Sequence, residues 1–238
     1  AALLSKPYDF DILICTFEPM EIPEEFVALG IRNLLLDLRA TIEAHNLPLY
    51  WLPLVCYLRL WLPEALAGQY DRILYTDADT YLNTSELSRL FDIDIGPHAL
   101  AAVTDKMQWS KPDKPIIDFK ELGLNIGKYL NSGVCLIDVA RYNDAGLLSR
   151  MLEIHHRGTP LVHHDQSLLN LVLEGQGTEL SPDWNWQWTQ AFPKFTAKIE
   201  PKLLHFGGPT KPWKAAIMPT NYPTEIIDDY QVFLEHHQ

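Results

Sequence analysis

Two aspartates one residue apart follow an apolar run in the first third of the chain. Residues 73–82 read Ile-Leu-Tyr-Thr-Asp-Ala-Asp-Thr-Tyr-Leu, so Asp77 and Asp79 come directly after a strand-like segment. Side chains alternate faces along a strand, and open α/β sheets bind ligands at the carboxyl ends of their strands. Both carboxylates would then point the same way and could hold a hard divalent cation, which relieves their repulsion. A turn or a helix cap is the alternative, because Asp is common in both.

A second polar segment near the carboxyl end could serve the same cation. Here His205 follows an apolar pair, a Gly-Gly-Pro turn contains Gly208, and Lys211 comes next. Glycine lets a backbone approach a phosphate closely, and a lysine adds a positive charge. The loop could therefore cradle a diphosphate while His205 completes a metal site. An ordinary tight turn with a surface lysine is the alternative interpretation.

Two further motifs lie at the ends of predicted elements. Asn131 and Ser132 come before the apolar run of residues 133–138, which indicates a turn that leads into a strand. Asp165 and Gln166 begin an apolar helix-like segment, where Asp165 could equally cap the helix by accepting backbone amide hydrogens. Alone, neither motif distinguishes a ligand site from local structure.

The hydrophobic pattern alternates strand-like and helix-like segments along the whole chain. It predicts an α/β fold with a mostly parallel central sheet and helices on both faces. We expect one domain over residues 1–238, with a long loop from Asp105 to Tyr129. The predicted strands cover residues 10–16, 31–36, 73–76, 100–103 and 134–139. One helix is predicted to begin near Pro23, and three others cover residues 54–66, 85–91 and 165–173.

Composition narrows the classes of protein. The 238 residues are 47% hydrophobic and 21% charged, which suits a globular chain with a substantial core. Nineteen basic against 31 acidic residues give a net charge of −12, so neither a nucleic-acid partner nor an anionic membrane surface is favoured. The three cysteines, Cys15, Cys56 and Cys135, are unpaired in apolar runs, which is typical of reduced core thiols and predicts a cytoplasmic protein. No segment is apolar over the length needed to span a bilayer.

Four motifs together resemble glycosyltransferase family 8, which includes glycogenin and bacterial lipopolysaccharide galactosyl- and glucosyltransferases. The resemblance extends from about Phe10 to Trp213 and implies the Rossmann-like GT-A fold. The motifs occur in the order and approximate spacing of the family; they are DADT at 77–80, YLNSGV at 129–134, HDQSLLN at 164–170 and HFGGPTKPW at 205–213.

The resemblance implies a UDP-sugar donor, a carbohydrate or glycoconjugate acceptor, and transfer of a hexose with retention of configuration. It implies Mn²⁺ or Mg²⁺ as the metal, since oxygen and imidazole ligands suit these ions. We expect Asp165 and Gln166 to act as electrostatic and orienting groups rather than as a covalent nucleophile. The implied metal ligands are Asp77, Asp79 and His205, and the implied donor contacts are Arg59, Ala78, Asn131, Ser132, Gly208 and Lys211.

The acceptor would be bound by two further segments, residues 105–128 and the Trp-rich run from Trp184 to Trp188. Aromatic rings stack on the apolar faces of sugars, and Asn185 or Gln187 could bind hydroxyl groups. Burial of the tryptophans in the core is the competing interpretation.

The chain also departs from the family pattern. Residues 10–16 align with the second strand of the family, so we expect the first strand and its base-binding loop to be lacking at the amino end. Residues 1–7 resemble the last turn of a helix. Two other functions therefore stay open. One is a haloacid-dehalogenase-like Mg²⁺ phosphatase, although Tyr81 stands where that class has Thr or Val, and the other is a sugar-nucleotide-binding protein without catalysis.

Overall fold

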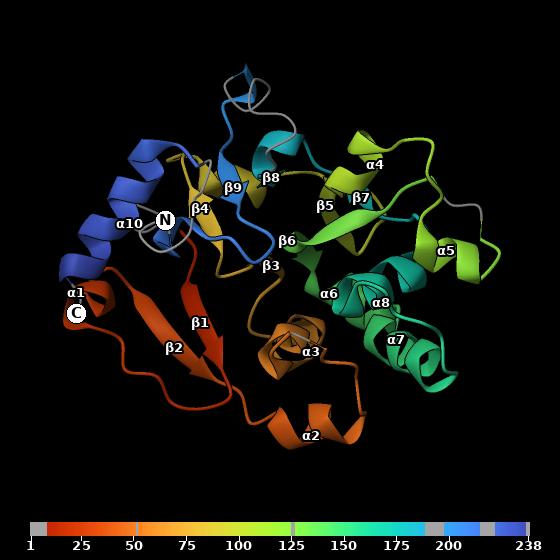
Figure 1. Ribbon diagram of the computed structural model, residues 1–238. Helices are drawn as coiled ribbons and strands as arrows, with labels where there is room; N and C mark the ends of the chain where they lie inside the picture. Colours follow the sequence, from red (N-terminus) through yellow and green to blue (C-terminus); the bar gives the residue numbers. More distant parts are fainter. Residues whose placement is uncertain (1–8, 51, 125–126, 189–197, 215–221, 237–238) are drawn as a thin grey trace. The chain divides into compact units, whose positions relative to one another are not determined.

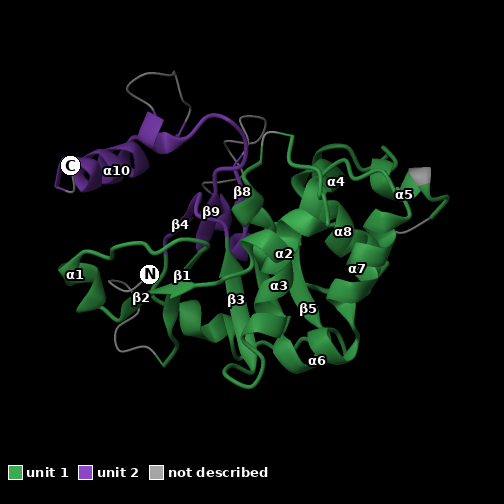
Figure 2. Cartoon of the chain, turned by 90° about the horizontal axis from the view of Figure 1, so that it is seen from below, with its two compact units in different colours: residues 1–76, 84–180 green, residues 77–83, 181–238 purple. Residues whose placement is uncertain are grey.

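The chain is described from a computed structural model that covers residues 9–50, 52–124, 127–188, 198–214 and 222–236. It separates into two compact units (Figure 2): unit 1 comprises Ala1–Thr76 and Thr84–Leu180, and unit 2 comprises Asp77–Asn83 and Ser181–Gln238. The single domain and the absence of a first strand both stay predictions. The expected helix end at residues 1–7 lies outside the described residues.

Unit 1 begins with two parallel strands joined through a short helix. Strand β1, Ile12–Thr16, pairs with β2, Ile31–Leu35, and helix α1, Glu24–Val27, lies between them in the chain (Figure 1). Pro23 directly precedes α1, as its fixed backbone angle favours at a helix start. The next helix, α2, covers Arg39–Ala44. The strands and the helix start predicted for this region are confirmed.

The larger sheet of unit 1 is mixed, and this corrects the prediction of a mostly parallel sheet. In the described part of the unit its strand order is β3-β6-β5-β7, with β6 antiparallel to both neighbours and β7 parallel to β5. All five residues of β5 and eight of nine in β6 are buried, so the sheet is covered on both faces as expected. A strand covered on both faces is apolar throughout whichever way it runs, so the pattern could not reveal its direction. The strands are β3, Arg72–Thr76; β5, Leu100–Thr104; β6, Leu130–Asp138; and β7, Thr178–Glu179.

Helices cover this sheet and contribute much of the core. The predicted helix over residues 54–66 is a 3₁₀ turn that continues into α3, and the one over 85–91 is a 3₁₀ turn, Leu87–Leu90. The expected long loop from Asp105 to Tyr129 contains two short helices. Asp105 caps the first of them, since its side chain accepts from the Met107 amide. The helices are α3, Leu58–Ala65; α4, Lys106–Ser110; α5, Ile117–Glu121; α6, Val139–Asp144; α7, Leu147–His156; and α8, His164–Leu173.

Unit 2 contains a small three-stranded sheet and a helix. Strand β9, Leu203–His205, lies between β4, Thr80–Leu82, and β8, Trp186–Gln187; it is antiparallel to β4 and parallel to β8. Helix α10 covers Thr224–His236, and 3₁₀ turns occupy Pro182–Trp184 and Pro212–Lys214. Among the described helices of both units, none combines the length and the apolar character needed to cross a bilayer.

The cysteines agree with the prediction of reduced core thiols. None of the three is in a disulfide; Cys135 is buried, and Cys15 and Cys56 are partly buried. Burial raises the pKa of the Cys15 thiol to about 11, which keeps the reactive thiolate rare at neutral pH.

Candidate functional site

The turn after β3 brings Asp77 and Asp79 together. We expected them to share a face by strand alternation, but Thr76 ends the strand, and Asp77 to Asp79 form the connection to β4. The turn is tied by the Thr80 hydroxyl, which donates to the Asp77 carbonyl at 2.9 Å, and by the Phe206 amide, which donates to the Asp79 carbonyl at 2.9 Å. The convergence of the two carboxylates is therefore a property of the turn rather than of the strand.

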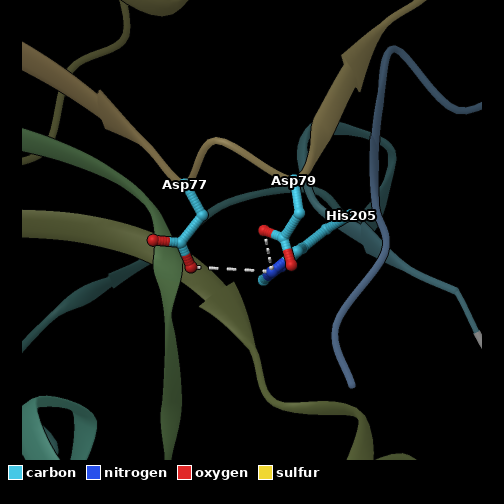
Figure 3. Close-up of side chains that lie close together, drawn as sticks. All are labelled: Asp77, Asp79 and His205. Atoms are coloured by element: carbon cyan, nitrogen blue, oxygen red, sulfur yellow. Dashed lines mark ion pairs between the residues drawn. The ribbon is translucent and has the colours of Figure 1, made fainter. Parts of the chain in front are cut away.

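His205 completes a cluster of three potential metal ligands within unit 2. It is the last residue of β9 and lies opposite Thr80 of β4. Its Nε2 atom is 3.6 Å from Asp77 Oδ2 and 3.4 Å from Asp79 Oδ1 (Figure 3). The three ligand atoms lie within 4.8 Å of one another. Two carboxylate oxygens and an imidazole nitrogen directed at one point form a donor set that fits Mn²⁺ or Mg²⁺.

Asn185 orients the imidazole, a role that the sequence did not predict for it. Its Oδ1 atom lies 3.1 Å from Nδ1 of His205, and its side chain is fully buried. When Nδ1 donates to Asn185, Nε2 is the atom left to face the carboxylates, either with a proton for them or with a lone pair for a cation. The only signal in the sequence was an amide between two tryptophans, which we assigned to an acceptor instead.

Lys211 lies beside the same carboxylates. Its ammonium forms an ion pair with Asp79 Oδ2 and also donates to the Phe206 carbonyl at 2.6 Å. Burial alone would raise the pKa of Asp79, but hydrogen bonds and positive charge from His205 and Lys211 outweigh it and lower the pKa to about 2. Asp79 is therefore ionised at neutral pH, with Oδ2 engaged by Lys211 and Oδ1 facing His205.

Gly208 and Ala78 belong to the two loops that carry these groups. Gly208 has a φ of +100°, which disfavours residues with a side chain, and a Cβ there would have no atom within 4 Å. This backbone is therefore open on the side where a side chain would stand, as close approach of a ligand to the main chain requires. Ala78 separates Asp77 from Asp79 within the turn.

The other predicted site residues gather in the buried part of unit 1. Arg59 of α3 forms an ion pair with Asp165 of α8 at 3.1 Å, and both side chains are at most 7% exposed. Ser132 accepts from Arg59 through its carbonyl at 2.9 Å and donates its hydroxyl to Asp165 at 3.0 Å. Asn131 and Ser132 lie within β6 rather than in a turn before it, since β6 begins at Leu130. Helix α8 begins at His164, so Asp165 lies in its first turn rather than at the cap.

Gln166 is held at both ends of its amide group. Its Oε1 accepts from Asn131 Nδ2 and from the Ser132 amide, each at 3.0 Å, and its Nε2 donates to Asp105 at 3.0 Å. The same Asp105 oxygen accepts from Asn131 at 3.0 Å. Asp105 is thus a central acceptor of this network, a role that the sequence did not indicate, since it marked Asp105 as the start of a loop expected to bind the acceptor.

Two tryptophans of the 184–188 segment, Trp184 and Trp186, are buried and not available to stack on a sugar, whereas Trp188 is partly exposed. Trp184 and Trp186 are 5% and 3% exposed, and Asn185 and Gln187 are also buried. Their burial supports the interpretation that these four residues belong to the core, and it corrects their assignment as contacts of the acceptor.

Replacing Trp186 should therefore affect stability and leave acceptor binding unchanged. We expect Trp186→Ala to lower the free energy of unfolding by about 3–5 kcal/mol, since a buried indole is lost and a cavity is left. Urea denaturation measures this, and kinetics with a varied acceptor give its KM. A higher KM in protein of unchanged stability would contradict the core interpretation.

The chain resembles solved glycosyltransferases in its fold. The crystal structure of galactosyltransferase LgtC in complex with donor and acceptor sugar analogs superimposes with a TM-score of 0.66, at 22% identity over 84% of this chain and 74% of that one. The fold is that of the GT-A glycosyltransferases.

The family follows from sequence. The model for glycosyl transferase family 8 matches residues 8–216, and the chain belongs to this family. General stress protein A of Bacillus subtilis (strain 168) is 30% identical over 177 residues, which cover 67% of this chain and 59% of that protein. The lipopolysaccharide 1,2-glucosyltransferase of Escherichia coli (strain K12) is 28% identical over 192 residues, 76% of this chain and 54% of that protein. The chain thus spans little more than half the length of these two relatives.

Proposed function

We propose that the protein is a metal-dependent hexosyltransferase that uses a UDP-sugar and a carbohydrate-type acceptor and retains the anomeric configuration. The observation that carries the proposal is the cluster of Asp77, Asp79 and His205, whose ligand atoms lie within 4.8 Å of one another. Family membership and the sugar-transferring relatives support the hexose and the acceptor class. The same family membership favours a glycosyltransferase over the alternative function of a haloacid-dehalogenase-like phosphatase.

In this proposal the residues of unit 2 stabilise the leaving group. Glycosyl transfer releases a nucleoside diphosphate whose negative charge grows as the glycosidic bond breaks, and a divalent cation bound to its oxygens stabilises that charge. Asp77, Asp79 and His205 would hold Mn²⁺ or Mg²⁺, with Asn185 keeping Nε2 of His205 directed at it. Lys211 would bind the distal phosphate beside the open backbone of Gly208.

The buried groups of unit 1 would bind and orient the sugar. Asp165 is already engaged by Arg59 and Ser132, and both ends of the Gln166 amide are hydrogen-bonded. Groups held in this way suit orientation and electrostatic stabilisation better than covalent attack, which requires a nucleophile free to move onto the sugar. Detection of a glycosyl adduct on Asp165 or Gln166 by mass spectrometry would contradict this assignment.

The decisive test of the proposal is a screen of UDP-sugars with and without Mn²⁺. We expect one donor to raise the melting temperature only with metal present, and to release UDP when a carbohydrate acceptor is added. Proton NMR of the product then shows whether its anomeric configuration matches that of the donor. Binding without release of UDP would instead identify a sugar-nucleotide-binding protein.

Removal of the lysine should slow the reaction without unfolding the protein. We expect Lys211→Ala to lower kcat/KM by about 30-fold, which corresponds to about 2 kcal/mol of lost transition-state stabilisation from a charge-assisted contact. Steady-state kinetics of UDP release measure this. An unchanged kcat/KM would remove Lys211 from the donor site.

A further inference from the structure

Lys211 has a partner that its proposed role at the diphosphate does not require. Its ammonium is paired with Asp79 Oδ2, while the other oxygen of Asp79 is 3.4 Å from Nε2 of His205. The lysine side chain is only 16% exposed, so solvent screens this pair incompletely. The same carboxylate is thus shared by a potential metal ligand and by an internal cation.

A cation already bound to a carboxylate weakens the binding of a second one. The lysine charge repels a divalent ion in the neighbouring position, and Asp79 Oδ2 is engaged by the ammonium. Lys211 should therefore oppose metal binding as long as no anion is present to attract it away.

A nucleoside diphosphate changes the sign of this effect. Its terminal phosphate offers several charged oxygens to an ammonium group, so Lys211 can exchange Asp79 for the phosphate. The exchange frees Asp79 Oδ2 for the metal ion. The attraction of the metal ion and of the lysine to the same anion then outweighs the repulsion between these two cations. Metal and diphosphate would then strengthen the binding of each other.

We propose that Lys211 couples the two ligands: it antagonises the metal alone and supports it once a nucleoside diphosphate is bound. The inference rests on the proposed function, because it takes the diphosphate as a ligand of this site. It adds that the donor-binding lysine also controls when the metal binds.

The surrounding contacts allow the side chain to move while its loop stays in place. The Tyr222 hydroxyl donates to the Thr210 carbonyl at 2.8 Å, next to Lys211 in the chain. On the other side of the lysine, the Trp213 ring packs on Tyr230 of α10 with 5.2 Å between ring centres. With Thr210 and Trp213 held, we expect rotation of the lysine side chain, whose ammonium also donates to the Phe206 carbonyl at 2.6 Å, to change its partner.

The test is the affinity for Mn²⁺, measured from the electron paramagnetic resonance signal of the free ion with and without saturating UDP. Without UDP, we expect Lys211→Met to bind Mn²⁺ about 10-fold more tightly than the parent, a change of about 1.4 kcal/mol. With UDP, we expect the same variant to bind Mn²⁺ about 10-fold more weakly. In the parent, UDP should strengthen Mn²⁺ binding, and Mn²⁺ should strengthen UDP binding by the same factor.

Two variants serve as controls. Lys202 is a lysine of the same unit that pairs with Asp183 at 2.9 Å, so Lys202→Met removes the same charge without touching Asp79 and should leave both affinities at the parent values. Lys211→Arg keeps the positive charge and should keep Mn²⁺ binding weak without UDP. Unchanged or weaker Mn²⁺ binding by Lys211→Met without UDP would overturn the inference, as would a parent protein whose Mn²⁺ affinity is indifferent to UDP. The expected affinities without any release of UDP from UDP-sugars would overturn catalysis and leave the coupling intact.

Discussion

Asp79→Ala should abolish metal-dependent turnover and leave the fold intact. Asp79 contributes one of the three ligand atoms of the cluster and is also the carboxylate paired with Lys211. Its loss removes a ligand atom from the proposed metal site and leaves the Lys211 ammonium there without its carboxylate partner. We expect kcat/KM to fall by at least about 10³-fold, or about 4 kcal/mol of transition-state stabilisation. UDP release and Mn²⁺ affinity measure the two effects.

The control is a carboxylate of the same unit without a role in the cluster. Asp228 is exposed on α10, so Asp228→Ala should leave turnover and Mn²⁺ affinity unchanged. Circular dichroism of Asp79→Ala should match the parent, because the turn is also tied through backbone groups of Asp77 and Asp79. Residual metal-dependent turnover within 10-fold of the parent would exclude Asp79 as a ligand.

Arg59→Met should produce a large loss of stability in unit 1. The guanidinium pairs with Asp165 at 3.1 Å, donates to the carbonyls of Cys56 and Ser132 at 2.9 Å each, and lies 4.5 Å from the ring centre of Tyr75. Without it, the buried Asp165 carboxylate loses the arginine that pairs with it. We expect the free energy of unfolding to fall by about 3–5 kcal/mol in urea denaturation.

A second substitution separates the lost ion pair from lost packing. If the stranded charge of Asp165 is the main cost, Arg59→Met combined with Asp165→Asn should regain part of the stability, because the unpaired charge is then gone. Arg89→Met removes an exposed arginine that pairs with Glu86 at 2.9 Å, and should cost less than about 1 kcal/mol. If Arg59→Met and Arg89→Met lowered the free energy of unfolding equally, the buried Arg59–Asp165 pair would contribute no more to stability than an exposed pair.

Local patterns were sufficient for most of the described strands of unit 1 and for some of the helices, whereas α7 and α10 were not predicted. Apolar runs predicted β1, β2, β3 and β5, and the helical periodicity around Arg59 predicted α3, because burial of one face determines both patterns. Strand direction escaped prediction, since β6 is buried along nearly all its length and such a strand has the same composition in either direction. The helices between Asp105 and Tyr129 were missed because they are short and have no extended periodicity.

The residues of the candidate metal cluster were named from the sequence, because four motifs occur together in the order and approximate spacing of the family, although each motif alone is common. Their support could not be predicted. Asn185 contacts His205 from 20 positions away, and Asp105 contacts Gln166 from 61 positions away. Such hydrogen bonds depend on which strands are neighbours, and many polar residues along the chain are equally suitable partners.

The amino-acid sequence by itself determined the family, the kinds of chemical group in the site and the alternation of strands and helices, because these depend on residue type and local spacing. Only the tertiary structure decided that a turn, rather than strand alternation, unites Asp77 with Asp79. It also decided that Lys211 shares Asp79 with His205, and that the tryptophans at 184 and 186 are buried. The physical reason is that burial and charge pairing arise between segments distant in the chain, where packing selects one partner among many.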